Sequence, residues 1–181
     1  LRRDSGEVLL GRRNDSMRFM AGTHVFPGGR IDDDESIAHV AGADDDYHAR
    51  AVHAAVREVF EESGVLCVEG QIPRDDVLHE ARVKMLKDEL KLDEVLTSAR
   101  LVIPADRFAP AGAWITPGNN PIRFDTRYYL FEHDGRQQER LIEGEMTRLD
   151  WLAPAQARRM WQDGAVDLPG KSVIVVGDVM T

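Results

Sequence analysis

The stretch HAAVREVFEESGV, residues 53–65, has the pattern of an amphipathic helix with one acidic face. At 100 degrees per residue, three glutamates fall within about 60 degrees of one another. These are Glu58, Glu61 and Glu62. Valine and phenylalanine side chains gather on the opposite side, and Gly64 is of the residue type that most often ends a helix. We therefore expect a helix over residues 51–63 that packs through its apolar face and presents carboxylates on the other.

Acids that share a helix face repel one another, because residues three and four apart are neighbours. Each like-charged pair costs roughly a few tenths of a kcal/mol. Arg57 stands four residues before Glu61 and can offset this cost as a surface ion pair on an ordinary solvated helix. Alternatively, the carboxylates bind Mg²⁺, which prefers oxygen ligands in octahedral geometry. The residues alone leave both interpretations open.

A short apolar run and a glycine turn precede this helix. Residues 24–26 lead into PGG, residues 27–29, which predicts a strand that enters a tight turn. The two glycines carry no side chain, so they can bring backbone groups close to the acidic face. Two aspartate triplets follow at residues 32–34 and 44–46. We interpret both triplets as solvated loop.

REVFEESGV, residues 57–65, resembles the second half of the Nudix box, whose pattern is G-x5-E-x7-R-E-U-x-E-E-x-G-U with U apolar. The first half of the pattern fits from Gly29, because Glu35 follows after five residues. Between Glu35 and Arg57 the chain has twenty-one residues where the pattern has seven, which places an insertion of fourteen residues at about 36–49. The position of Glu35 relative to the helix is left open by this insertion.

The resemblance implies a fold and a set of site residues. The elements predict one α/β domain over residues 1–181, and the resemblance implies the Nudix fold, a mixed β-sheet sandwiched between helices. It implies that Mg²⁺ or Mn²⁺ is held by Glu58, Glu61, Glu62 and the carbonyl of Gly29. The candidate catalytic residues are Glu58, Glu61, Arg57 and Glu145, the last of which resembles a distant glutamate that some members bring to the metal. Glu35 is a further candidate for that role.

Several segments resemble one branch of the family. The interrupted box, followed by WITP, IRFDTRYYLF and GEMTRLDWLAPAQA, is similar to the branch that includes a peroxisomal coenzyme A diphosphatase. This resemblance implies hydrolysis of a nucleoside diphosphate linked to another group, with coenzyme A or its thioesters as the first candidate substrate. ADP-ribose, a nucleotide sugar and NADH are alternatives. A Nudix-fold domain that binds a nucleotide without cutting it is the remaining one.

A turn-rich loop between two predicted strands is the candidate substrate wall. Arginines there can hold phosphates, and aromatic side chains can stack on a base. The candidates are Arg123, Arg127, Trp114 and Phe124. Alternatively, Arg127 is a surface charge at a strand edge and Trp114 belongs to the core. His48 and His53 lack metal-ligand spacing, and we expect them to be solvated or to cap the helix.

The remaining elements are read from periodicity and turn residues. Strands are expected at residues 8–13, 24–26, 113–116, 126–131, 146–152 and 172–176. Helices are expected twice within residues 75–99 and once over 154–161. No repeat or linker interrupts this series.

Composition limits the classes of partner. The net charge of −9 argues against nonspecific nucleic-acid binding, which requires cations against phosphates. No apolar run approaches the ~18 residues of a membrane span. The single cysteine, Cys67, excludes an internal disulfide, favours a cytoplasmic location and is expected in the core. The resemblance also allows a homodimer. Because the chain opens without Met, we expect that residues precede it and that the first strand is incomplete.

Overall fold

The computed structural model describes residues 1–2, 4–18, 20–115, 124–142 and 144–166. The α-helices and the short 3-10 helix are α1 (Asp46–Ser63), α2 (Asp75–Met85), α3 (Leu92–Ala99), η1 (Ala105–Arg107) and α4 (Pro154–Gln162). The strands are β1 (Val8–Arg13), β2 (His24–Val25), β3 (Val40–Ala41), β4 (Ile103–Pro104), β5 (Ala109–Ile115), β6 (Asp125–Leu130) and β7 (Met146–Leu152).

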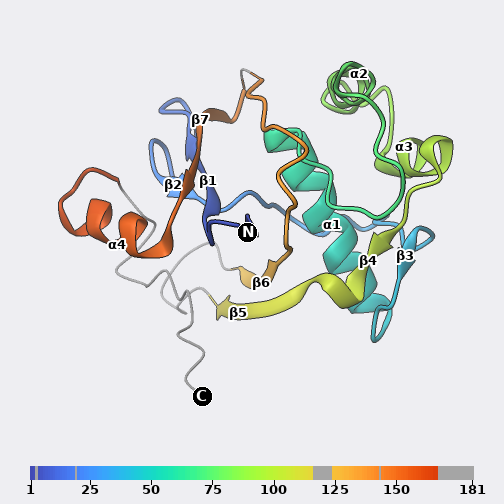
Figure 1. The fold of residues 1–181 in the computed structure, drawn as a ribbon, viewed down its shortest axis with the longest axis horizontal. Helices are drawn as coiled ribbons and strands as arrows, with labels where there is room; N and C mark the ends of the chain where they lie inside the picture. Colours follow the sequence, from blue (N-terminus) through green and yellow to red (C-terminus); the bar gives the residue numbers. More distant parts are fainter. Residues whose placement is uncertain (3, 19, 116–123, 143, 167–181) are drawn as a thin grey trace.

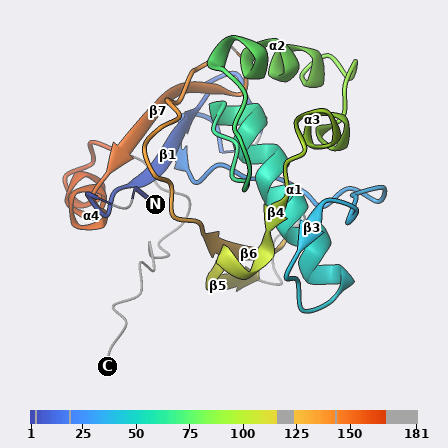
Figure 2. The same cartoon turned by 45° about the vertical axis from the view of Figure 1, so that its right-hand side comes forward.

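Helix α1 lies at the centre of the molecule. In Figure 1, β1, β2 and β7 lie on one side of it and α2 and α3 on the other, and in the turned view of Figure 2 it still lies between β1 and β7 on one side and α3 on the other. Three side chains on its apolar face, Val52, Val56 and Phe60, have no exposed surface. They join one core cluster with residues of α2, α3, β4 and the segment that follows α1. The helix is therefore fixed by burial of this face.

The strands form three small sheets in the described part of the chain. In the largest, β1 pairs antiparallel with both β2 and β7, while β3 pairs parallel with β4 and β5 antiparallel with β6. Helix α4 covers the outer side of the largest sheet, where Leu10, Leu152 and Ala157 form a second buried cluster. The predicted α/β class with mixed strand directions is confirmed.

Helix α1 begins five residues earlier than the sequence pattern indicated. The interpretation of the second aspartate triplet as exposed loop holds for Asp44 and Asp45, which precede the helix, but was wrong for Asp46. The carboxylate of Asp45 accepts a hydrogen bond from the backbone N–H of His48 at 2.7 Å and so caps the helix. Asp46 lies in the first turn, where a negative charge is favourable next to the positive end of the helix dipole. The first triplet does lie in an exposed loop.

The inserted segment is attached to α3 and β4. Its strand β3 pairs with β4, and the N–H of Ile103 donates to the carbonyl of His39 at 2.8 Å. The side chain of His39 also contacts Thr97 Oγ1 at 2.9 Å. Asp34 lies just ahead of the insertion, and one of its carboxylate oxygens is 2.6 Å from Lys91 Nζ. These contacts fix the path of the chain between the glycine turn and α1.

Most other predicted elements are present. Helices α2 and α3 and strands β1 and β7 lie where the periodicity indicated, β5 starts four residues earlier than expected, and Cys67 is buried in the main core. Strands β3 and β4 were not predicted, because two residues are too few to show a period. The predicted strand at 172–176 lies outside the described residues.

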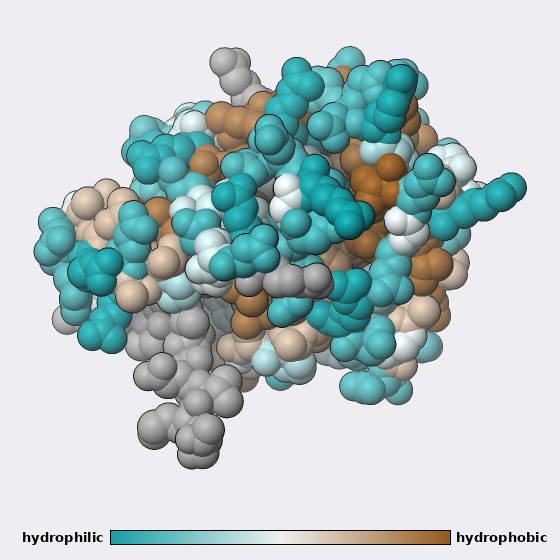
Figure 3. All heavy atoms as spheres, in the orientation of Figure 1, coloured by the Kyte–Doolittle hydropathy of each residue, from teal (hydrophilic) through white to brown (hydrophobic). Residues whose placement is uncertain are grey.

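Polar side chains cover much of the face in Figure 3, with apolar patches between them. Among the helices of the described ranges, none is both long enough and apolar enough to cross a bilayer.

Candidate metal-dependent active site

The acidic face of α1 lies against the glycine turn. The backbone N–H of Gly28 donates to Glu62 Oε2 at 3.0 Å. A β-carbon placed on Gly29 would collide with both carboxylate oxygens of Glu58. A side chain at position 29 would therefore displace the Glu58 carboxylate from where it lies, and the backbone of the turn lies beside the predicted metal ligands.

Arg57 joins two neighbours on its own helix to the loop that follows the turn. Its Nη1 lies 2.9 Å from Glu58 Oε1 and 3.4 Å from Glu61 Oε2. Its Nη2 donates to the carbonyl of Arg30 at 2.9 Å and lies 3.2 Å from Asp32 Oδ2. One guanidinium thus orients two of the three glutamates on the acidic face.

Glu35 reaches Arg57 in spite of the insertion. Its Oε1 accepts from Arg57 Nε at 3.2 Å and its Oε2 from Nη2 at 3.1 Å. Its side chain is only 2% exposed. Burial opposes ionisation of this carboxyl, but hydrogen bonds from His53 and Arg57 outweigh it and hold the pKa at about 2. Glu35 is therefore an ionised partner of Arg57. Its Oε1 also contacts His53, and its Oε2 also accepts from the N–H of Asp32.

His53 is buried, so the prediction of a solvated or capping histidine was wrong at this position. It is 4% exposed and lies on α1 one turn before Arg57. His48 is half-buried, its N–H is capped by Asp45, and its ring stacks on Tyr129 at 5.8 Å between ring centroids.

Glu145 lies immediately before β7, near the acidic face. Its Oε2 is 3.5 Å from Arg13 Nη2, its carbonyl accepts from the N–H of Asn14 at 2.7 Å, and its side chain is 63% exposed. The negative charge of Glu145 contributes to raising the pKa of both Glu58 and Glu62. The structure thus brings the distant glutamate into electrostatic range of the acidic face.

The positive charge beside the acidic face is too small to neutralise its three glutamates. Burial raises the pKa of Glu58 and of Glu61, and Arg57 opposes the shift in both. Burial and the charges of Glu58 and Glu145 raise the pKa of Glu62 to about 8, although the N–H of Gly28 favours ionisation. A cation placed here would relieve the repulsion, so the donor set fits a hard divalent ion.

The carboxylates are not gathered as a finished coordination shell. Among the described residues, no three His, Cys, Asp or Glu side chains converge closely enough to hold an ion. Instead Arg57 and the N–H of Gly28 hold oxygens of the three glutamates. Binding of an ion therefore requires side-chain rotation on a helix that is already in place.

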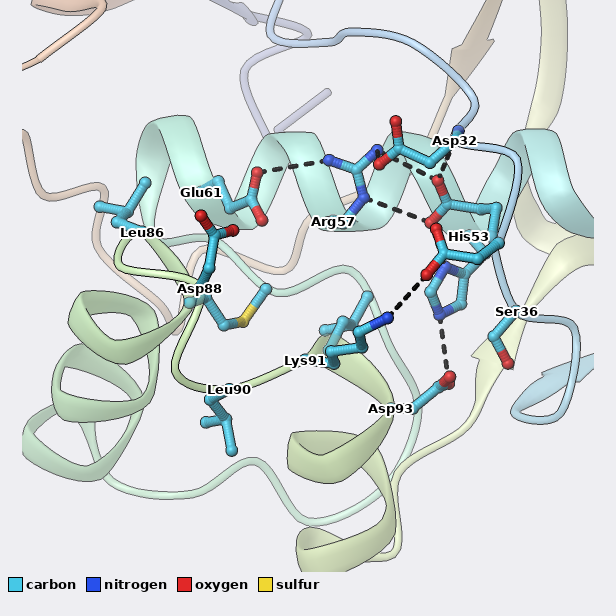
Figure 4. Close-up of a pocket in the computed structure, with 14 residues that line it drawn as sticks. Asp32, Ser36, His53, Arg57, Glu61, Leu86, Asp88, Leu90, Lys91 and Asp93 are labelled. Carbon is cyan, nitrogen blue, oxygen red and sulfur yellow. Dashed lines mark hydrogen bonds and ion pairs between the residues drawn. The ribbon is translucent and has the colours of Figure 1, made fainter.

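A cavity of about 430 Å³ opens beside Arg57 and Glu61. In Figure 4, Glu61, Asp88, Lys91 and His53 project into it from α1 and from the α2–α3 connection. Its lining combines acids with an apolar wall. The acids are Asp32, Asp34, Glu35, Glu61, Asp88 and Asp93, and the apolar side chains are Met85, Leu86, Leu90 and Leu92.

The predicted substrate wall is only partly described. Arg123 lies outside the described residues. Trp114 is 42% exposed and Phe124 is 36% exposed, so Trp114 does not belong to the core. Arg127 Nη2 pairs with Asp125 at 3.0 Å, and Arg127 lines a second cavity of about 410 Å³ beside His48. Neither Trp114 nor Phe124 is among the described residues that line it.

The second cavity lies toward the start of α1. His48 precedes Glu58 by ten residues, which is about 15 Å along a helix. The structure thus separates Arg127 from the acidic face along the helix. A residue beside Arg127 does reach the glycine turn, because the Tyr128 ring meets Phe26 edge-on at 6.1 Å. Tyr128 was not predicted as a site residue.

Arg82 is another residue that the sequence pattern did not single out. It is 2% exposed, and its guanidinium donates to the backbone carbonyl of Glu61 from Nε at 3.0 Å and from Nη2 at 2.9 Å. Nη1 donates to the carbonyl of Arg140. Burial lowers the pKa of Arg82 to about 10. A charged residue at a position where the helix period requires burial was the signal that could have identified it.

Comparison with known proteins identifies a family for the chain. The sequence model of the NUDIX domain matches residues 1–168. The chain is 30% identical over 169 residues to "Putative nudix hydrolase 7" of Caenorhabditis elegans. The aligned residues make up 92% of this chain and 53% of that protein. The chain therefore spans about half the length of the curated relative that it matches.

A solved structure of a NUDIX hydrolase shows the same fold. A NUDIX hydrolase from Alicyclobacillus acidocaldarius superposes with a TM-score of 0.76 and 26% sequence identity, over 90% of this chain and 78% of that one. The MutT protein from Methanosarcina mazei Go1 is 19% identical with a TM-score of 0.48, over 90% of this chain and 85% of that one.

Proposed function

The chain belongs to the NUDIX domain family, and from this premise we propose that it is a divalent-cation-dependent pyrophosphohydrolase of nucleoside diphosphate derivatives. The observation that carries the proposal is the contact between the acidic face of α1 and the glycine turn. A row of half-buried carboxylates with raised pKa values lies beside the backbone of a glycine turn, where a side chain on Gly29 would displace the Glu58 carboxylate.

The acidic face supplies the proposed metal ligands. Glu58, Glu61 and Glu62 would hold Mg²⁺ or Mn²⁺, with the carbonyl of Gly29 as a backbone ligand. When bound, such an ion neutralises diphosphate oxygens and acidifies a water molecule. An acidic protein needs this neutralisation before it can accept a polyanion.

Other side chains of this site have two roles, which are to orient the metal-binding carboxylates and to transfer a proton. Arg57 holds Glu58 and Glu61 and so fixes the direction of their oxygens. Glu145, which is exposed and lies near Glu58 and Glu62, is the leading candidate for the general base. Glu58 is the alternative base, because its raised pKa brings it closer to neutral pH. Glu35 is assigned to neither role, since its oxygens are occupied by Arg57 and His53.

The substrate is a small nucleotide-type molecule, and coenzyme A or an acyl-coenzyme A is the first candidate. This choice rests on the branch resemblance of the sequence. One observation favours ADP-ribose, a nucleotide sugar or NADH instead. The described lining of the 430 Å³ cavity carries six acids against two cations, Arg57 and Lys91, which is a poor environment for the additional phosphate of coenzyme A.

Binding without hydrolysis is the second alternative. It is weakened by the presence of all three glutamates of the box, and by the short distance between them and the glycine turn. A homodimer and a cytoplasmic location remain parts of the proposal. The proposal includes neither a membrane nor a nucleic acid as a partner.

A substrate panel with product analysis tests the function. The full chain is incubated with each candidate and Mg²⁺ or Mn²⁺, and products are identified by mass. Coenzyme A should yield phosphopantetheine and an adenosine bisphosphate, whereas ADP-ribose should yield AMP. Glu61→Gln and Glu62→Gln should each lower kcat strongly, whereas Glu80→Gln, on the exposed face of α2, should not.

Two outcomes would contradict the proposal. Equal turnover by the wild-type chain and by both box variants removes the acidic face from the chemistry. Tight binding of one panel member without any product, at all metal concentrations, would instead establish the non-catalytic alternative.

A further inference from the structure

His53 lies between two carboxylates and is nearly inaccessible to solvent. Its Nδ1 is 2.6 Å from Glu35 Oε1, and its Nε2 is 3.3 Å from Asp93 Oδ1 on α3. Figure 4 shows the ring of His53 pointing from α1 toward Asp93, away from the Arg57 side. The contact with Asp93 is within ion-pair distance but is not a hydrogen bond, so the short contact with Glu35 is the one that orients the ring.

Glu35 is the residue through which His53 can affect the site. The carboxylate of Glu35 accepts from Arg57 at both oxygens, its Oε1 also contacts His53 Nδ1, and its side chain is 2% exposed. Without His53, this buried carboxylate would lose a partner and could rotate. Because Arg57 bonds to both oxygens of Glu35, a rotation would move the guanidinium that holds Glu58 and Glu61.

We propose that His53 is a positioning residue, which fixes the Glu35 carboxylate and through it the guanidinium of Arg57 against the acidic face of α1. Its contact with Asp93 joins this series of side chains to α3, outside the box. The inference rests on the proposed function, because the role of Arg57 matters only if the acidic face performs chemistry. His53 itself touches neither substrate nor cation in this scheme.

A second buried histidine provides a matched control. His133 is 5% exposed, its Nε2 lies 3.0 Å from the carbonyl of Gln137, and its ring stacks on Trp151. Its contacts are structural and lie apart from Arg57. A substitution at His133 therefore reports the effect of losing a buried imidazole without any effect on the proposed series.

Replacement of His53 should change turnover more than substrate binding. Substitution of residues that orient catalytic or metal-binding groups typically lowers activity about 10- to 100-fold. We expect His53→Leu to lower kcat to this extent with KM changed less than about threefold. His53→Gln, which can still donate to Glu35, should recover part of the loss. Asp93→Asn should lower kcat in the same direction by a smaller factor, and His133→Gln should leave kcat unchanged.

A double-mutant cycle shows whether His53 acts through Glu35. Single variants His53→Gln and Glu35→Gln and the double variant are compared in kcat and in the urea midpoint of unfolding. If the two residues act as one unit, His53→Gln changes little once Glu35 is replaced. The same cycle between His133 and Glu35 should be additive. Additive losses between His53 and Glu35, or an equal loss of kcat in His133→Gln, would overturn the proposal.

The unfolding measurement separates this inference from the function on which it rests. If the wild-type chain hydrolyses no member of the panel, the proposed function fails, and non-additive midpoints still support a single His53–Glu35 unit. If the chain is active and His53→Leu lowers only the midpoint, with kcat unchanged well below the melting temperature, His53 is structural and the inference fails.

Discussion

Arg82 on α2 donates two hydrogen bonds to the backbone carbonyl of Glu61, in the last turn of α1. This carbonyl has no partner within its own helix, as is general for the last turn, and a buried guanidinium satisfies it. The same arginine also donates to the carbonyl of Arg140. A single side chain thus joins the end of the acidic helix to α2 and to the segment that leads to β7.

Replacing Arg82 by methionine should destabilise the protein by about 2–4 kcal/mol. The substitution leaves the buried carbonyls of Glu61 and Arg140 without donors. Removing one partner of a buried hydrogen bond costs more free energy than the intact bond contributes to stability. Urea unfolding measures the change. Arg74→Met, at an exposed arginine that pairs with Asp76 before the same helix, should change stability by less than about 0.5 kcal/mol. A comparable loss at both positions would contradict the assignment.

Gly29→Ala should lower kcat/KM by about a hundredfold or more with a folded protein retained. The new methyl group would displace the Glu58 carboxylate, and a shift of about 1 Å in a catalytic group has an effect of this order. Steady-state kinetics and a thermal melt give the two readouts. Gly135→Asn is the control, because Asn tolerates the left-handed backbone of Gly135 and the site there is open. Full activity in Gly29→Ala would show that the close approach has no function.

Asp45→Ala should cost about 1 kcal/mol of folding free energy, because it removes the side chain that caps α1. Asp33→Ala, in the exposed loop of the first triplet, should change stability by less than about 0.5 kcal/mol. Urea midpoints of the two variants decide between a cap and a solvated charge. Equal midpoints would mean that α1 does not depend on its N-cap.

Glu62 should make the stability of the metal-free protein fall with rising pH. Its pKa in the folded state is about 8, against an ordinary value of 4.5, so between these values the folded protein retains a proton that the unfolded chain has lost. Stability therefore decreases from about pH 4.5 to about pH 8, and Glu62→Gln should make this decrease shallower.

Magnesium should reverse this trend. Because the ion competes with the proton on Glu62, the rise in melting temperature caused by Mg²⁺ should be larger at about pH 8 than at about pH 6. The same titration of Glu62→Gln should show a smaller and flatter effect. A shift that is independent of pH and identical in the variant would place the ion elsewhere.

Local pattern was enough to predict the acidic row, the glycine that ends α1 and the turn ahead of it. The helix start was misread because Asp45 belongs to a run of charges, and a run of charges also suits a loop. The contacts of His53 and Arg82 could not be predicted, since their partners are 18 and 21 residues away and depend on how α1 packs. The separation of Arg127 from Glu58 along the helix likewise follows only from the three-dimensional path.

The attachment of the inserted segment to α3 and β4 has a consequence for how such motifs are found. Glu35 meets Arg57 because β3 and the side chains around it return the chain to the same place, and the added residues are absorbed partly by a longer helix. Spacing along the sequence and distance in space are therefore independent here. Searches that demand a fixed interval between the two halves would overlook this chain, whereas a search for the arginine–glutamate contact itself would find it.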